Sequence, residues 1–142
     1  MARCYRFNGS VAPEGLRQGI RKAFPGLLVQ TVDSAAASNE KLFEMLGEQT
    51  LEASRGGGTL AKKPEVDLLL RLGGTAQISR ALQEVGTKHG RSFVLVVIGE
   101  EADVRGLESA EGSGWERLQR RELDREEMRR IERAALLDAE RA

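Results

Sequence analysis

The feature that most constrains the fold is the stretch of residues 65–86, because its apolar residues change period near the middle. Between 66 and 72 an apolar residue stands at every second position, which is the period of a β-strand. Between 78 and 85 apolar residues recur at i, i+3, i+4 and i+7, which is the stripe of an amphipathic helix. Gly73, Gly74 and Thr75 stand between the two patterns. We therefore predict a strand, a tight glycine turn and a helix of about three turns.

The predicted turn has a chemical consequence. Thr75 is placed to cap the helix and Gly86 to end it. Backbone N–H groups at such a helix start hold an anion without a positive side chain. The alternative is that the two glycines only allow the strand and the helix to pack closely, and both readings stay open.

The rest of the chain continues the alternation of strands and helices. Helices are predicted after Pro13 and over residues 39–54, and the run 93–98 is apolar at every position, which predicts a central strand covered on both faces. The remaining strands are predicted at 3–8 and 27–32. This order predicts an α/β (α+β) fold, a single domain over residues 1–142 with a mixed four- to five-stranded sheet flanked by helices.

The last third of the sequence is highly charged. Residues 100–114 are predicted as an acidic loop, and Ser113 with Glu116 forms a capping box for a long C-terminal helix over about 115–140. We expect that helix either to pack on its own sheet or to dock on a partner, and Leu136-Leu137 close to the terminus favours docking slightly. The apolar residues predicted to bind a partner are Leu123, Met128, Ile131, Ala135 and Leu137.

Composition excludes several classes of protein. The 22 basic and 22 acidic residues balance, so any nucleic-acid binding needs a local basic patch. One cysteine, Cys4, excludes an internal disulfide and a multi-cysteine metal site. There is no apolar run long enough for a membrane span, and the first residues lack the core of a signal peptide. We expect a soluble cytoplasmic protein that needs no membrane.

No catalytic pattern is found. The single histidine, His89, lies in a polar turn, and nothing in the sequence pairs it with Cys4. The glycines match neither the dinucleotide fingerprint nor the P-loop, and no spacing fits a metal site. We therefore expect no enzyme activity, no cofactor and no metal.

Basic residues near the glycine turns are the remaining candidates for a binding site. If the fold gathers them, the second helix, the loop at 61–63 and the glycine turn line one cleft that suits a single-stranded nucleic-acid end. Otherwise they are solvated surface charges. These cations are Lys41, Arg55, Lys62, Lys63, Arg71 and Arg80.

An ordered series of short motifs carries a family resemblance. It begins with Lys41-Leu42-Phe43 and Leu60-Ala61-Lys62, continues through the run 65–72 and Gly74-Thr75-Ala76-Gln77-Ile78, and ends with Ala81 and Gly86. On these motifs, residues 35–99 resemble the small regulatory subunit of the KEOPS (EKC) complex, the PRPK-binding protein family, in its compact archaeal form.

The resemblance implies a non-catalytic protein with two partners. One is the kinase-like ATPase subunit of KEOPS, the complex that makes threonylcarbamoyl-adenosine in tRNA, against which the terminal helices of the family pack. The other is tRNA, held by its single-stranded 3′ CCA tail. Gln77 and Ile78 match the family's Gln-Ile motif, and Lys62 its basic loop residue. Ala76 stands where members often carry arginine, and Lys63 is the expected replacement for that charge. The predicted RNA contacts are Lys41, Lys62, Lys63, Gly74, Thr75, Gln77 and Ile78.

Two other functions stay open. One is a scaffold or activator of the kinase-like subunit that makes no contact with RNA. The other is a sensor of a small anionic ligand, held at the glycine turn.

Overall fold

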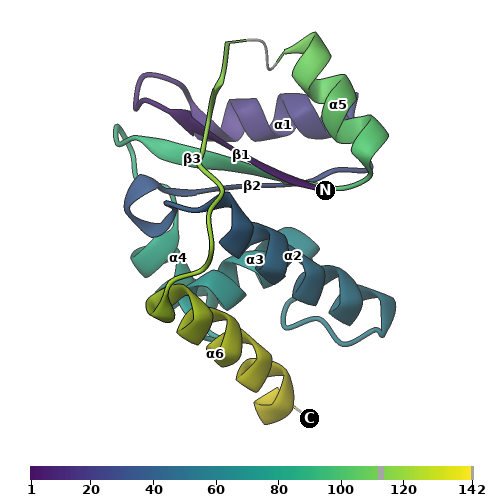
Figure 1. Cartoon of the computed structure of the whole chain (residues 1–142), viewed down its shortest axis with the longest axis vertical. Helices are drawn as coiled ribbons and strands as arrows, with labels where there is room; N and C mark the ends of the chain where they lie inside the picture. The colour runs from purple at the N-terminus through teal and green to yellow at the C-terminus, as the bar shows by residue number, and fades with distance from the viewer. Residues whose placement is uncertain (112–113, 142) are drawn as a thin grey trace.

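A four-stranded antiparallel sheet lies between helices in the computed structural model, which describes residues 1–111 and 114–141 (Figure 1). The strand order is β2-β3-β1-β4, and every neighbouring pair is antiparallel. The expected α/β fold with a flanked sheet is confirmed, although the sheet is antiparallel where a mixed one was predicted. The elements are β1 (Ala2–Phe7), α1 (Pro13–Ala23), β2 (Leu28–Asp33), the 3-10 turn η1 (Ser34–Ala36), α2 (Glu40–Arg55), α3 (Pro64–Gly73), α4 (Ile78–Val85), β3 (Phe93–Ile98), α5 (Glu101–Ala110), β4 (Glu116–Arg117) and α6 (Arg125–Arg141).

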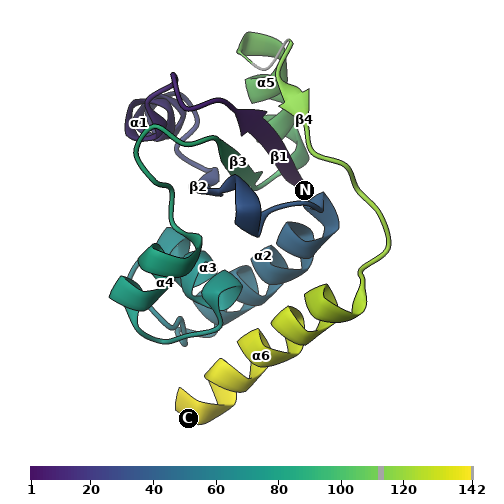
Figure 2. The ribbon, with the colours of Figure 1, turned by 90° about the vertical axis from the view of Figure 1, so that its left-hand side faces the viewer.

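The two faces of the sheet carry separate apolar cores. Val94 and Val96 of β3 pack in the core shared with α2, α3 and α4, whereas Leu95 and Val97 pack in the core shared with α1 and α5. All six residues of β3 are buried, so the predicted central strand is confirmed. Helix α6 lies outside α2 and α3, on the side away from the sheet (Figure 2).

Residues 64–73 form helix α3, and the predicted strand at 66–72 is wrong. Leucines 68, 69, 70 and 72 are all buried, so the segment is covered on several sides and its apolar pattern carries little information on period. Helix signals stand at both ends: Pro64 in the first turn, and Gly74, with φ of 66°, after the last turn. Leucine also favours helix over strand.

The glycine turn ends a helix rather than a strand. The N–H groups of Gly74 and Thr75 donate to the carbonyl oxygens of Arg71 and Leu70, which is the Schellman arrangement at a helix C-terminus. Thr75 does not cap α4 as predicted, because its Oγ1 accepts from the N–H of Gln77 at 3.1 Å, one residue before the helix begins. Gly86 ends α4 as predicted.

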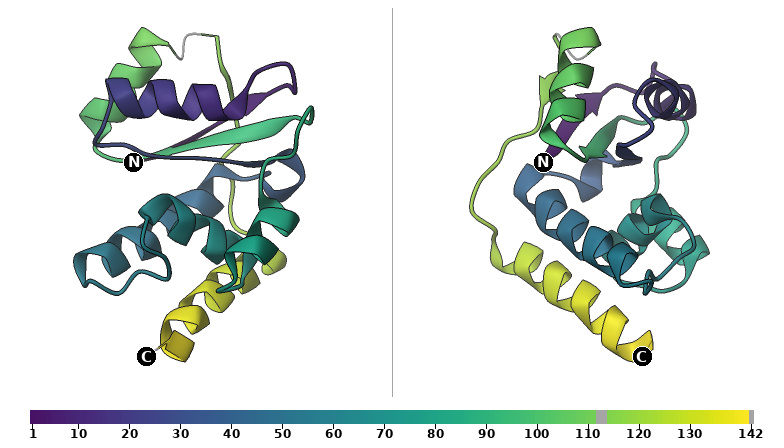
Figure 3. Two further views of the ribbon diagram at one scale, coloured as in Figure 1. Left: turned by 180° about the vertical axis from the view of Figure 1, so that it is seen from behind. Right: turned by 90° about the vertical axis from the view of Figure 1, so that its right-hand side faces the viewer.

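The C-terminal third also differs from the prediction. Residues 101–110 form α5, since Val104 and Leu107 are buried against the sheet in a segment predicted to be a loop. A helix from 115 is wrong, because Trp115 packs its ring edge-on against Tyr5 and the next residues form β4. The chain then runs extended to α6 (Figure 3).

Helix α6 begins at Arg125 with a capping box different from the predicted one. The N–H of Glu127 donates to Asp124 Oδ1 at 2.8 Å, and the N–H of Asp124 donates to Glu127 Oε1 at 3.0 Å. Ser113, the predicted cap, lies outside the described residues. Within the described ranges no helix combines the length and the apolar character that crossing a bilayer requires.

Candidate functional site

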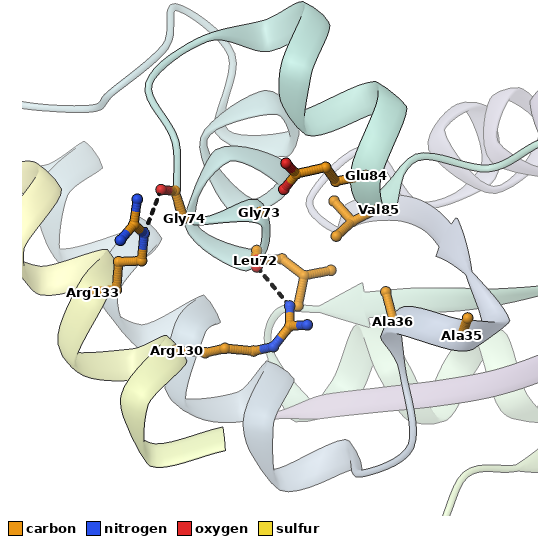
Figure 4. A pocket seen from close by; sticks show the side chains of 9 residues that line it. All are labelled: Ala35, Ala36, Leu72, Gly73, Gly74, Glu84, Val85, Arg130 and Arg133. Carbon is orange, nitrogen blue, oxygen red and sulfur yellow. Dashed lines mark hydrogen bonds between the residues drawn. The ribbon is translucent and has the colours of Figure 1, made fainter. Parts of the chain in front are cut away.

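A pocket of about 300 Å³ opens at the C-terminal end of α3, beside the glycine turn (Figure 4). Its walls come from η1, the end of α3, the end of α4 and α6, so segments far apart in the sequence meet there. The lining residues are Ala35, Ala36, Leu72, Gly73, Gly74, Glu84, Val85, Arg130 and Arg133.

Two arginines of α6 supply the positive charge of this pocket. Arg130 Nη1 donates to the carbonyl oxygen of Leu72 at 2.8 Å, and Arg133 Nε donates to that of Gly74 at 2.7 Å (Figure 4). The last carbonyl groups of a helix carry its negative end, so these bonds neutralise the end of α3. Each guanidinium group keeps further N–H donors for a ligand. The one carboxylate of the lining, Glu84, accepts a hydrogen bond from Arg80 at 3.2 Å.

An ion network centred on the buried Arg71 holds α6 in this position. Arg71 is fully buried; its Nε lies 2.6 Å from Asp67 Oδ1, and its two terminal nitrogens lie 2.8 Å from the two carboxylate oxygens of Asp138. Burial lowers the pKa of Arg71, but the hydrogen bonds to Asp138 and Asp67 outweigh it, so the pKa is raised above its usual range. Arg71 is therefore no candidate for RNA contact, and it instead ties α3 to α6.

The structure keeps only part of the predicted RNA site together. Gly74, Thr75, Gln77 and Ile78 follow one another at the turn, and Ile78 is 49% exposed. Lys62 and Lys63 lie at the opposite end of α3, about 15 Å away for a helix of this length. Lys63 is thus badly placed to replace the arginine expected at Ala76.

Lys41 is not among the residues that line the pocket at the turn. It lies in the first turn of α2, where its Nζ is 3.4 Å from a carboxylate oxygen of Glu122. Lys62 follows the other end of α2, about 24 Å along a helix of 16 residues. The expected single cleft, with these lysines and the glycine turn together, is not formed.

Arg130 and Arg133 are not among the residues predicted for the site from the sequence. They lie more than fifty residues after the glycine turn, on a helix whose apolar side alone was predicted to bind a partner. Their spacing of three residues, which places both on one face of α6, was the available signal.

The residues predicted to bind a partner are divided between two environments. Ile131 and Leu123 are partly buried against the chain's own core, and Leu137 is buried. Met128 and Ala135 are exposed, Met128 to 51%. Helix α6 thus packs on α2 and α3, and only its outer side is accessible to a partner.

The two residues considered for nucleophilic chemistry lie in different surroundings. Burial, reinforced by the Glu40 carboxylate, raises the pKa of the Cys4 thiol well above its usual range, and a protonated thiol is a weak nucleophile. His89 lies on an exposed loop. Among residues 1–111 and 114–141, no group of three or more metal-binding side chains comes together.

Fold and pocket together define a small α/β domain with an arginine-lined pocket at a helix C-terminus. Comparison of the chain with protein-family models and with curated proteins finds no match.

Proposed function

We propose that the chain is a non-catalytic, cytoplasmic accessory subunit of a KEOPS-type complex. In this proposal it recruits tRNA by the single-stranded 3′ CCA tail and binds the kinase-like ATPase subunit. One observation carries the RNA-binding part: an exposed apolar side chain, Ile78, lies three residues from Thr75 and the arginine-lined turn. The series of motifs over residues 35–99 supplies the identity of the complex.

The chemistry of the turn suits a single-stranded RNA end. Ile78 offers an apolar surface to an unstacked base, and Gln77 offers an amide that both donates and accepts hydrogen bonds at a base edge. Arg133 and Arg130 have N–H donors left for a phosphate, for which a guanidinium group is well shaped. In this arrangement Arg133 takes the role expected of an arginine at Ala76.

The outer side of α6 is the proposed surface for the kinase-like subunit. Met128 and Ala135, seven residues apart, lie on the same side of the helix, and Leu136 beside them is 59% exposed. Ile131 and Leu137 lie on the opposite, inward side of α6, where Ile131 packs against the core and Leu137 is buried.

The test is binding of intact tRNA and of tRNA without its 3′ CCA, each at two salt concentrations. We expect trimming to remove most of the affinity. Arg133→Ala is expected to weaken binding and to lower the salt slope by about 0.7, the value for one phosphate contact on a single strand. Lys22→Ala, an exposed basic residue near the end of α1, is the matched control.

Equal binding of intact and trimmed tRNA would contradict recognition of the tail. Absence of RNA binding, together with a complex that is lost in Leu136→Asp, would favour the scaffold function instead. A third function, a sensor of a small anion, is favoured by the two arginines in the pocket. Its mark would be thermal stabilisation by a small anionic ligand in the absence of RNA binding.

A further inference from the structure

A second cavity, of about 480 Å³, lies between the loop that precedes α1 and the loop that precedes β3. The two loops lie side by side at one end of the sheet (Figures 1 and 3). They touch so closely that a Cβ atom on Gly9 would stand 2.2 Å from the carbonyl oxygen of Gly90. The side chains that matter for its chemistry are Glu14, Arg17, Leu82, Lys88, His89 and Arg91.

The cavity carries more positive than negative charge. Arg17, Lys88 and Arg91 line it beside a single carboxylate, Glu14, and within the described part of the chain none of these cations is in a salt bridge. Arg17 Nη1 donates to the hydroxyl oxygen of Thr31 at 2.6 Å, and Lys88 Nζ donates to a backbone carbonyl at 3.2 Å. These acceptors are neutral, so Glu14 is the one negative charge of the lining against three cations.

Two further observations point to an anion. Burial and the neighbouring Arg21 lower the pKa of Arg17 more than the Glu14 carboxylate raises it, so the charged form of Arg17 is held there at a cost that a further anion would offset. Helix α1 starts at the cavity, and its N-cap residue, Ala12, makes no side-chain cap. The N–H groups of the first turn of α1 therefore add positive potential to that of the side chains.

Helix α4 connects this cavity to the glycine turn. Leu82, which lines the cavity, is 52% exposed and follows the exposed Ile78 by four residues, so both lie on one side of α4. The helix has eight residues and is about 12 Å long. An apolar strip between two cationic sites is the arrangement that holds a single strand, with bases on the strip and phosphates at the cations.

We propose that this cavity is a second anion site, which takes a backbone phosphate of the RNA strand whose 3′ end lies at the glycine turn. The inference rests on the proposed function for the identity of the ligand, whereas the charge of the cavity is independent of that function.

His89 makes the site directly observable, since it is the only histidine of the chain and lines the cavity. Its ring resonances are followed by NMR during titration with inorganic phosphate, with the trinucleotide CCA and with a longer single strand that ends in CCA. Sodium chloride at equal ionic strength is the control. We expect saturable shifts with the longer strand and none with the trinucleotide.

Affinity measurements then use the double variant Lys88→Ala with Arg91→Ala, whose side chains lie in a loop and leave both cores intact. The longer strand is expected to bind about tenfold more weakly, with a salt slope lower by about 0.7 per lost contact, while the trinucleotide is unaffected. The control variant, Lys22→Ala with Arg105→Ala, removes the same charge elsewhere and is expected to leave the affinity for both ligands unchanged.

The two proposals fail in different ways. If the wild-type protein binds the longer strand but the double variant binds it equally well, or His89 does not respond, the second site is overturned and the glycine turn is not. If no RNA binds, the proposed function fails, and with it the RNA as ligand. A saturable response of His89 to inorganic phosphate would then still support an anion site for a free phosphate-bearing molecule, and no response would overturn that site too.

Discussion

The buried ion pair between Asp67 and Arg71 gives the sharpest stability prediction. Three residues donate to the Asp67 carboxylate: Arg71 through Nε at 2.6 Å and Nη2 at 3.4 Å, Thr50 through its hydroxyl at 2.6 Å, and Leu60 through its N–H at 2.7 Å. Asp67→Ala leaves all three without this acceptor, in a region where Asp67 and Arg71 are fully buried. Each unsatisfied buried group costs about 1–3 kcal/mol, and breaking a buried ion pair costs about 3–5 kcal/mol. We expect a loss of about 3–5 kcal/mol in the free energy of unfolding.

Urea denaturation followed by circular dichroism measures this loss, with the slope of the transition unchanged. The chain contains a matched control: Glu101 and Arg105 form the same i, i+4 pair, with Nε 2.7 Å from the carboxylate, but are 62% and 63% exposed. Glu101→Ala is expected to cost no more than about 0.5 kcal/mol. A loss of that size for Asp67→Ala as well would refute the argument that burial makes the first pair costly to break.

Three further predictions test local features. Gly74→Ala is expected to destabilise the protein by about 1–2 kcal/mol and to weaken RNA binding, because φ is 66° and the new Cβ would lie 2.6 Å from Arg133 Nε. Thermal denaturation and tRNA titration measure the two effects, and unchanged stability would contradict the turn geometry. Asp124→Ala removes the N-cap of α6 and is expected to lower the free energy of unfolding by about 1 kcal/mol, as measured by urea denaturation. Asp124→Asn is expected to retain most of that stability, since asparagine also caps helices. Because the pKa of Cys4 is raised in the fold, its protonated thiol contributes fully to the free energy of unfolding below the unfolded thiol pKa, about 8.5. That contribution is lost as the pH rises toward the higher folded pKa. Between those two pH values the wild type should lose stability relative to Cys4→Ala by up to about 1.4 kcal/mol per pH unit, and parallel curves would be inconsistent with a thiol that stays protonated in the fold.

Where the sequence predicted the fold, the pattern was local and unambiguous. The unbroken apolar run of β3 is short and rich in β-branched residues, which predicts a strand covered on both faces, and the structure has it. The run before Gly73 failed because leucines buried on several sides mimic a period of two, although Pro64 and Gly74 marked the ends of a helix. In α5, Val104 and Leu107 are three residues apart, and the acidic residues around them hid the helical period.

For the candidate site, too, the sequence predicted what depends on neighbouring residues and not what depends on distant ones. Gly74, Thr75, Gln77 and Ile78 are neighbours in sequence, so any fold keeps them together. Arg133 comes to the turn because the Arg71–Asp138 ion pair anchors α6 on α3, and such pairing between distant residues leaves no local pattern. Lys62 and Lys63 are separated from the turn for a simple geometric reason, since helix α3 stands between them and Gly74.

The strand order also constrains how the chain acquires its structure. β1 and β2 are complete by residue 33, yet they do not pair with each other, and each adds its ladder to β3, at residues 93–98. About two thirds of the polypeptide must therefore be synthesised before the first ladder closes, and loop closures of that span slow folding. Until then both early strands expose their backbone edges. A nascent chain that ends before β3 is therefore expected to depend on chaperones that shield such edges.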